Sequence, residues 1–202
     1  MDKILINTAN RHLRKTDTVM AQLMKRCDPI TFTTTRPPHY HALVRAIISQ
    51  QLSVKAAGTI QKRLQTKHGG RYFKAERMLK LKSTTLRGCG LSNNKVRYVR
   101  SLAQAITSGG LNFRKLVKQD DDSVRDILTQ YPGIGQWSAD MFLITSLRRP
   151  DVFPIGDLVL RKSMQRHYRL SDDTQHDKYI SIANAWRPYR TIASLYLWKT
   201  SQ

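Results

Sequence analysis

Acidic side chains are scarce in this sequence: there are 14 of them in 202 residues, and Glu76 is the only glutamate. Lys and Arg together number 35, so the formal net charge is +21. An imbalance of this size goes far beyond what solubility requires. It indicates a polyanionic partner.

Cysteines and long apolar runs are also lacking. The two cysteines, Cys27 and Cys89, can form at most one disulfide and cannot alone ligate a four-cysteine zinc site or an iron–sulfur cluster. No apolar run exceeds five residues, and the first residues lack the apolar stretch of a signal peptide. We therefore expect a reduced, intracellular protein that is neither secreted nor membrane-spanning.

The apolar residues that are present recur at helical spacing, and they make up 40% of the chain, enough for a sizeable core. Leu43, Val44, Ile47 and Ile48 form one such series, whereas alternation of period two is nearly absent. The pattern predicts an all-α fold. The predicted helices are 8–15, 18–26, 39–50, 54–67, 75–81, 93–108, 113–118, 123–131, 136–147, 158–167, 177–186 and 189–199.

Capping residues mark several of these helix ends. Ser53, Ser92 and Ser123 each precede a periodic segment, where a hydroxyl can accept a hydrogen bond from an exposed helix N–H group. Gly109-Gly110 follows another segment, where a left-handed C-cap is expected.

A connector rich in Thr and Pro runs from residue 28 to 38 and is predicted to be a loop or extended segment. It separates an N-terminal helical segment and linker, residues 1–37, from the main body, residues 38–202. We expect the N-terminal helices to pack on the C-terminal lobe.

Positive charge is concentrated in residues 55–118, which contain sixteen Lys or Arg and a single acid, Glu76. The solvated surface of a basic protein would also carry many charges. Because the excess extends over several helices, we favour a footprint for a phosphate backbone.

Residues 128–139 place a Pro- and Gly-containing turn between two helical segments. Pro132 ends the first helix, and Gly133 and Gly135 permit a tight turn with no Cβ between the backbone and a ligand. The second helix then begins with N–H groups that, together with the helix dipole, can bind one phosphate. A plain corner between two helices would use Gly and Pro as well, but the charge of the chain favours the phosphate site.

The motifs around this turn resemble those of the helix-hairpin-helix DNA glycosylases, most closely the 3-methyladenine DNA glycosylase II branch. The hairpin is Pro-Gly-Ile-Gly at 132–135, and Arg-Pro-Asp-Val-Phe-Pro-Ile-Gly-Asp-Leu at 149–158 places Asp157 where the family has its catalytic aspartate. Residues 41–53 and 186–190 match too, so the resemblance spans about 38–200. It implies two helical lobes that carry a helix-hairpin-helix motif, with a cleft between the lobes.

The chemistry of glycosidic bond cleavage agrees with the choice of Asp157. Breaking this bond builds positive charge on the sugar, which a nearby carboxylate can stabilise. From the hairpin to the next helix, the other acids are Asp140, inside the second hairpin helix, and Asp151, in a basic loop. Asp157 starts an apolar helix, so its alternative role is that of an ordinary N-cap, and one side chain can serve both purposes.

Two tryptophans resemble the aromatic base pocket of the alkylation-repair branch. Trp137 and Trp198 can stack on a flipped base and favour a cationic one; the alternative for Trp198 is core packing, the role that we assign to Trp186. Bifunctional members of the family carry a nucleophilic lysine two residues after the second hairpin glycine, where this chain has Trp137. The resemblance therefore implies a monofunctional hydrolase with no lyase step.

The resemblance also implies a set of DNA contacts. Gln51 resembles the side chain that fills the gap left by the flipped base, although it could instead be a polar residue between two helices, and Gln50 could fix the loop geometry. Main-chain carbonyls of the hairpin are implied to hold a structural Na⁺ or K⁺. The residues assigned to DNA binding are Gln51, Gly133, Ile134, Gly135 and Ser138, and those assigned to the cation are Thr129, Tyr131 and Gly133.

These observations together predict a monomeric enzyme without a required cofactor. It would flip alkylated bases of the 3-methyladenine and 7-methylguanine type out of double-stranded DNA and hydrolyse the glycosidic bond in base excision repair. The alternative is a non-catalytic helix-hairpin-helix DNA-binding protein. Either would act in the bacterial or archaeal cytoplasm, at the nucleoid, or in a eukaryotic nucleus.

Overall fold

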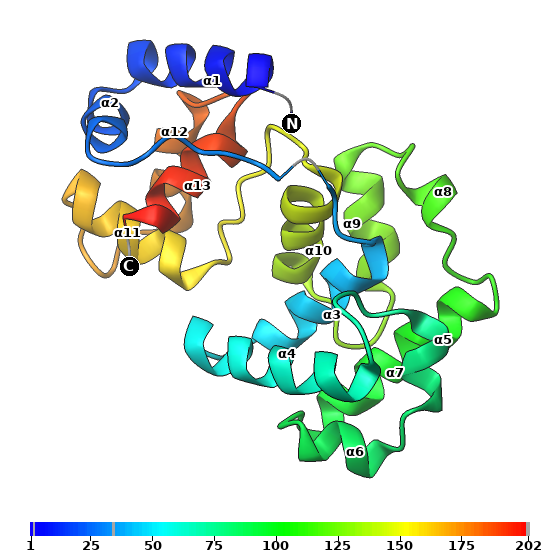
Figure 1. The fold of residues 1–202 in the computed structure, drawn as a ribbon. Helices are drawn as coiled ribbons and strands as arrows, with labels where there is room; N and C mark the ends of the chain where they lie inside the picture. The colour runs from blue at the N-terminus through cyan, green and yellow to red at the C-terminus, as the bar shows by residue number, and fades with distance from the viewer. Residues whose placement is uncertain (2, 34, 201–202) are drawn as a thin grey trace. The chain divides into compact units, whose positions relative to one another are not determined.

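The computed structural model describes residues 1, 3–33 and 35–200, and over these residues it consists of helices and the segments that join them (Figure 1). The predicted all-α fold is confirmed. The helices are α1 (Lys3–Thr16), α2 (Thr18–Lys25), α3 (His39–Ser49), α4 (Val54–His68), α5 (Ala75–Lys80), α6 (Ser83–Gly88), α7 (Asn93–Thr107), α8 (Phe113–Leu116), α9 (Asp121–Thr129), α10 (Gln136–Phe142), a π-helical turn η1 (Leu143–Leu147), α11 (Leu158–Tyr168), α12 (His176–Asn184) and α13 (Arg190–Lys199).

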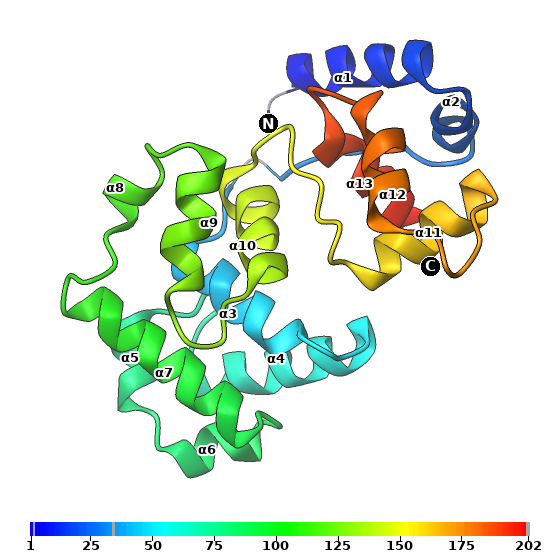
Figure 2. The ribbon, with the colours of Figure 1, turned by 180° about the vertical axis from the view of Figure 1, so that it is seen from behind.

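The chain divides into two compact units. The terminal unit combines Met1–Thr35 with Arg148–Gln202, and the middle unit comprises Arg36–Leu147. In the terminal unit the first and last helices of the chain, α1 and α13, pack together, as both views show (Figures 1 and 2). The N-terminal helices are thus part of the core that α11, α12 and α13 form.

Trp186 lies at the centre of the terminal unit and is fully buried. Its indole N–H donates to Asp17 Oδ2 at 2.7 Å, and the hydroxyl of Tyr168 donates to the same oxygen at 2.7 Å. Asp17 is also the N-cap of α2, because its Oδ1 accepts from Met20 N at 2.9 Å. One carboxylate therefore joins the second helix of the chain to the C-terminal segments, and the assignment of Trp186 to the core is confirmed.

The middle unit is built around α3, which packs against α4, α7, α10 and η1. Eight consecutive or nearly consecutive residues of α3 are buried, so the helix is apolar on nearly all sides and must lie inside. Between α9 and α10, a partly buried ion pair joins Arg125 Nε to Asp140 Oδ1 at 2.7 Å. This contact fixes the two helices that flank the hairpin.

Several predicted boundaries are wrong for identifiable reasons. The first helix begins at Lys3, not at residue 8, because its buried series already starts at Ile6. The helix α6 is absent from the predicted set, because it has six residues with only Leu86 buried and is too short to show a helical period. Asp120, not Ser123, caps α9: its Oδ1 accepts from Ser123 N at 2.8 Å, and a carboxylate suits the positive end of a helix.

Other local predictions are confirmed. Ser53 and Ser92 accept hydrogen bonds from the third residue of α4 and α7, and Gly109 has the left-handed φ of +82°. None of the helices in the described residues is both long and apolar enough to cross a membrane.

Candidate active site

Asp157 is the N-cap of α11 and is half-buried. Its Oδ1 accepts a hydrogen bond from Leu160 N at 2.8 Å and a second from the indole N–H of Trp198 at 3.0 Å. The start of α11 thus fixes the carboxylate from one side and α13 from the other. Capping and catalysis are compatible here, since both donors are neutral and leave the negative charge in place.

The first turn of α13 holds residues 149–152 of the loop before Asp157. Thr191 donates its hydroxyl to Arg149 O at 2.7 Å and accepts from Val152 N at 3.0 Å, and its own N–H donates to Pro150 O at 3.0 Å. Nearer to the aspartate, Arg161 Nη1 donates to Ile155 O at 2.7 Å. The loop that leads to the aspartate is therefore fastened at several backbone groups between residues 149 and 155.

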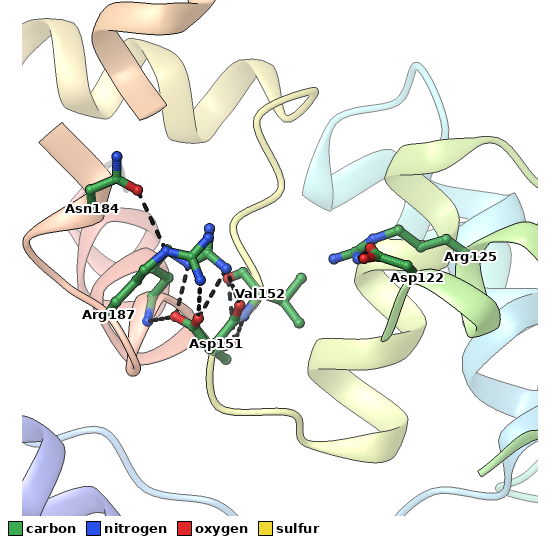
Figure 3. A network of polar contacts seen from close by, with 8 residues as sticks. Asp122, Arg125, Asp151, Val152, Asn184 and Arg187 are labelled. Atoms are coloured by element: carbon green, nitrogen blue, oxygen red, sulfur yellow. Dashed lines mark hydrogen bonds and ion pairs between the residues drawn. The ribbon is translucent and has the colours of Figure 1, made fainter. Parts of the chain in front are cut away.

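The two acids that lie between the hairpin and Asp157 are held in ion pairs. Asp151 accepts from Arg187 Nη1 at 2.9 Å (Figure 3). It also accepts from Arg190 Nε at 2.8 Å. Asp140 is buried beside Arg125. Because their charges are compensated by arginine, these two carboxylates are poor candidates for stabilising a cationic sugar.

In the hairpin, each of the two glycines meets a different requirement. Gly133 has a φ of +84°, and a Cβ there would overlap the ring of Tyr98 on α7. Gly135 has an ordinary φ of −96°, and a Cβ there would meet no atom within 4 Å. The first glycine is needed by the protein itself, whereas the second leaves open space above the N-terminus of α10.

Ile134 and Ser138 are buried, in contrast to the exposed Gly135. The N–H of Ile134 donates to Tyr131 O at 3.1 Å, and the hydroxyl of Ser138 accepts from Gln50 Nε2 at 2.8 Å. Their side chains therefore support the hairpin from inside the middle unit. Any contact that they make with DNA would be through the main chain.

The Gln50–Ser53 turn, between α3 and α4, lies beside the hairpin. Gln50 Nε2 donates to Gly133 O at 2.7 Å as well as to Ser138, so this side chain ties the two turns together. Gln51 at the tip is exposed and has a φ of +57°, a left-handed conformation that costs a non-glycine residue about 1–2 kcal/mol. Strain of this kind is kept where surrounding contacts enforce it.

The three carbonyls assigned to a monovalent cation are neutral oxygens, the donors that Na⁺ and K⁺ accept. Tyr131 O already accepts from Ile134 N, and Gly133 O already accepts from Gln50 Nε2. A carbonyl oxygen has two lone pairs, so each of these two retains one for a cation. Together with the carbonyl of Thr129, these oxygens are donors of the kind that such an ion accepts.

The two candidate pocket tryptophans belong to different units. Trp137 lies in the first turn of α10 in the middle unit, and Trp198 lies near the end of α13 in the terminal unit. Both are half-buried. The contact of Trp198 with Asp157 was not foreseen from the sequence, because nothing in the spacing of residues 157 and 198 signals it.

Comparison with known proteins identifies the family. The model of the family described as "HhH-GPD superfamily base excision DNA repair protein" matches residues 44–188, which is most of the chain. This chain belongs to the HhH-GPD superfamily. The matched residues of this HhH-GPD protein include Gln51, the hairpin and Asp157, whereas Trp198 follows them.

Individual relatives agree with that assignment. The DNA-3-methyladenine glycosylase 1 of Schizosaccharomyces pombe is 34% identical over 165 residues, covering 81% of this chain and 72% of the relative. The Bacillus subtilis protein YfjP is 30% identical over 80% of this chain, which spans only 58% of that protein's length. Among solved structures, the S. pombe 3-methyladenine DNA glycosylase Mag1 in complex with abasic DNA has a TM-score of 0.89 at 31% identity, with 96% of each chain covered.

Proposed function

We propose that this HhH-GPD protein is a monofunctional DNA-3-methyladenine glycosylase that removes alkylated bases from double-stranded DNA. The observation that carries the proposal is the placement of Asp157, a carboxylate held by the start of α11 and by Trp198, on a loop that Thr191 and Arg161 fasten. The similarity to S. pombe Mag1, whose structure contains abasic DNA, supports the substrate class.

In the proposed reaction, the bond between C1′ of the sugar and the base nitrogen breaks, and the base leaves with the bonding electrons. The carboxylate of Asp157 stabilises the positive charge that develops on the sugar and orients the water that attacks C1′. The water loses a proton to the solvent, and its oxygen becomes the hydroxyl of the abasic sugar. Cationic 3-methyladenine or 7-methylguanine leaves as a neutral base, so no strong general acid is required.

Selection of the base falls to the tryptophans. An indole face attracts a cationic ring by about 0.5–2 kcal/mol per contact, which favours alkylated over normal bases. Trp137 supplies such a face beside the hairpin. Trp198 has a second task, since its N–H holds the Asp157 carboxylate.

The same Trp137 supports hydrolysis without strand cleavage. A Schiff base with the sugar needs an uncharged amine, and an indole N–H cannot act as one. At the position where bifunctional relatives are expected to have lysine, this chain has no amine, and water is the remaining nucleophile.

DNA binding is proposed to centre on the hairpin and the exposed basic residues of the middle unit. Gly135 leaves room for a phosphate at the N-terminus of α10, and Gln51 fills the space that the extruded nucleotide leaves. Thr129, Tyr131 and Gly133 would hold Na⁺ or K⁺, which would add positive charge near that phosphate. The enzyme would then act as a monomer, at the nucleoid or in the nucleus.

The alternative, a DNA-binding protein without catalysis, makes a different prediction for one experiment. Methylated DNA is incubated with the protein, and the released bases are identified by chromatography. Release of 3-methyladenine or 7-methylguanine supports the proposal. Tight binding with no release, at protein in excess over DNA, would favour the binding protein.

A further inference from the structure

Lys95 differs from the other basic residues of the segment 55–118. Fourteen of the sixteen Lys and Arg side chains there are exposed, and the two that are half-buried are Lys95 and Arg100. Arg100 donates to Leu81 O at the end of α5. Lys95, on the first turn of α7, donates from Nζ to Ile48 O at 2.7 Å and to Gln50 O at 2.8 Å.

Those two carbonyls belong to the C-terminus of α3, where helix carbonyls lack partners within the helix and the dipole is negative. An ammonium group donates hydrogen bonds to these carbonyls and also brings a positive charge to the negative end of the helix. The side chain is half-buried, and this burial lowers the pKa of Lys95 from its usual value. Its ammonium keeps hydrogen bonds to both carbonyls in this position.

The contacts continue from Lys95 to the DNA-binding turns. Gln50, whose carbonyl Lys95 holds, donates its side-chain amide to Gly133 O, and Gln51 directly follows Gln50. One turn further along α7, the ring of Tyr98 lies against Gly133. Residues three apart face the same side of a helix. One face of α7 thus supports both the Gln50–Ser53 turn and the hairpin.

Extending the proposed function, on which this inference rests, we propose that Lys95 is a positioning residue. Its ammonium fixes the end of α3 so that Gln51 is held in its left-handed conformation and enters the gap left by a flipped base. Lys95 acts through Gln51 and not as a contact to the phosphate backbone.

A double-mutant cycle tests this inference. Lys95→Met keeps the chain length of the side chain but removes its charge and donors, and it should slow single-turnover release of 7-methylguanine by about tenfold or more, the scale of hydrogen bonds to a charged group. In a Gln51→Ala background the same change should slow release by less than about twofold, because two residues that act through one interaction are not additive. Multiplied losses in the double variant would overturn the proposal.

Matched variants separate positioning from loss of charge and from loss of fold. Lys178→Met removes one exposed charge on α12 and should leave release unchanged. Lys95→Arg can still donate to both carbonyls and should retain most of the rate. For Lys95→Met, we expect the wild-type slope of log affinity against log salt. A slope that is smaller by about 0.9, the value for one neutralised phosphate, would show that Lys95 contacts the DNA backbone. If Lys95→Met does not fold, Lys95→Gln is used in the same cycle.

A parallel measurement keeps this proposal distinct from the proposed function. The preference of each variant for a duplex with a tetrahydrofuran abasic analogue over an intact duplex is measured by titration. Gln51 fills the same gap whether or not a bond is hydrolysed, so Lys95→Met should reduce this preference only when Gln51 is present. Failure of the wild type to release bases would reject the glycosylase, and an undiminished preference in Lys95→Met would reject the role of Lys95.

Discussion

The two hairpin glycines should respond in opposite ways to the same added methyl group. Gly133→Ala places a Cβ at a φ of +84° and into the ring of Tyr98. The left-handed backbone costs about 1–2 kcal/mol for a residue with a Cβ, and overpacking adds about 1–3 kcal/mol. The free energy of unfolding should therefore fall by about 2–5 kcal/mol, a large part of the 5–15 kcal/mol typical of a domain.

Gly135→Ala meets no atom of the protein within 4 Å and keeps an allowed φ of −96°. It should leave stability unchanged or raise it by about 0.4–1 kcal/mol, because alanine has less conformational entropy to lose on folding. The methyl group nevertheless points into the space assigned to a phosphate. Affinity for all duplex sequences should therefore fall while the fold is intact.

For both glycine variants, urea unfolding measures the stability, and fluorescence titration with duplex DNA at fixed salt measures the affinity. Gly133→Ala with the wild-type unfolding midpoint would refute the packing of Tyr98 on the hairpin. Gly135→Ala with wild-type affinity would show that the hairpin does not anchor the DNA.

Three further predictions concern charge, chemistry and acid stability. Affinity for duplex DNA should fall with salt at a log–log slope of about −0.9 per phosphate neutralised, and a flat dependence would contradict a phosphate footprint. Borohydride should trap no protein–DNA adduct, and product strands should stay intact until alkali is added; efficient trapping would reveal a lysine nucleophile. Trp137→Ala should lose more activity than Trp137→Phe, because phenylalanine keeps an aromatic face for the base. Burial, followed by the positive charge of Arg45, lowers the pKa of His41 from 6.5 to about 4. Between these two pH values His41 is therefore neutral in the folded protein and protonated in the unfolded chain. Stability present above pH 6.5 should be lost between pH 6.5 and 4, by at most about 3 kcal/mol, and His41→Gln should flatten this slope in unfolding measured against pH.

The elements that sequence could predict are those with local signals. The period of Leu43 to Ile48 identifies α3, and Ser53 and Ser92 mark helix starts, because each signal lies within one turn of what it controls. Asp157 could be singled out because the chain has few acids and a family motif surrounds it. Its capping role is visible from its place before an apolar helix.

The supports of the site could not be predicted, since they depend on backbone acceptors distant in sequence. Lys95 binds carbonyls 45 and 47 residues away, and Thr191 binds Arg149 O, 42 residues away. Main-chain carbonyls have no sequence signature, so nothing distinguishes Lys95 from its fifteen basic neighbours. The buried positions of Ile134 and Ser138 likewise follow from tertiary packing and not from the turn itself.

The central claim is that the charge of Asp157 drives base release, and Asp157→Asn tests it most directly. Asparagine keeps the shape, and its amide oxygen can still cap α11 and accept from Trp198. Single-turnover release of 7-methylguanine should fall by about 10²–10³-fold, as when one preorganised electrostatic group is removed, with affinity for abasic DNA kept. Release near the wild-type rate in folded Asp157→Asn would contradict the mechanism.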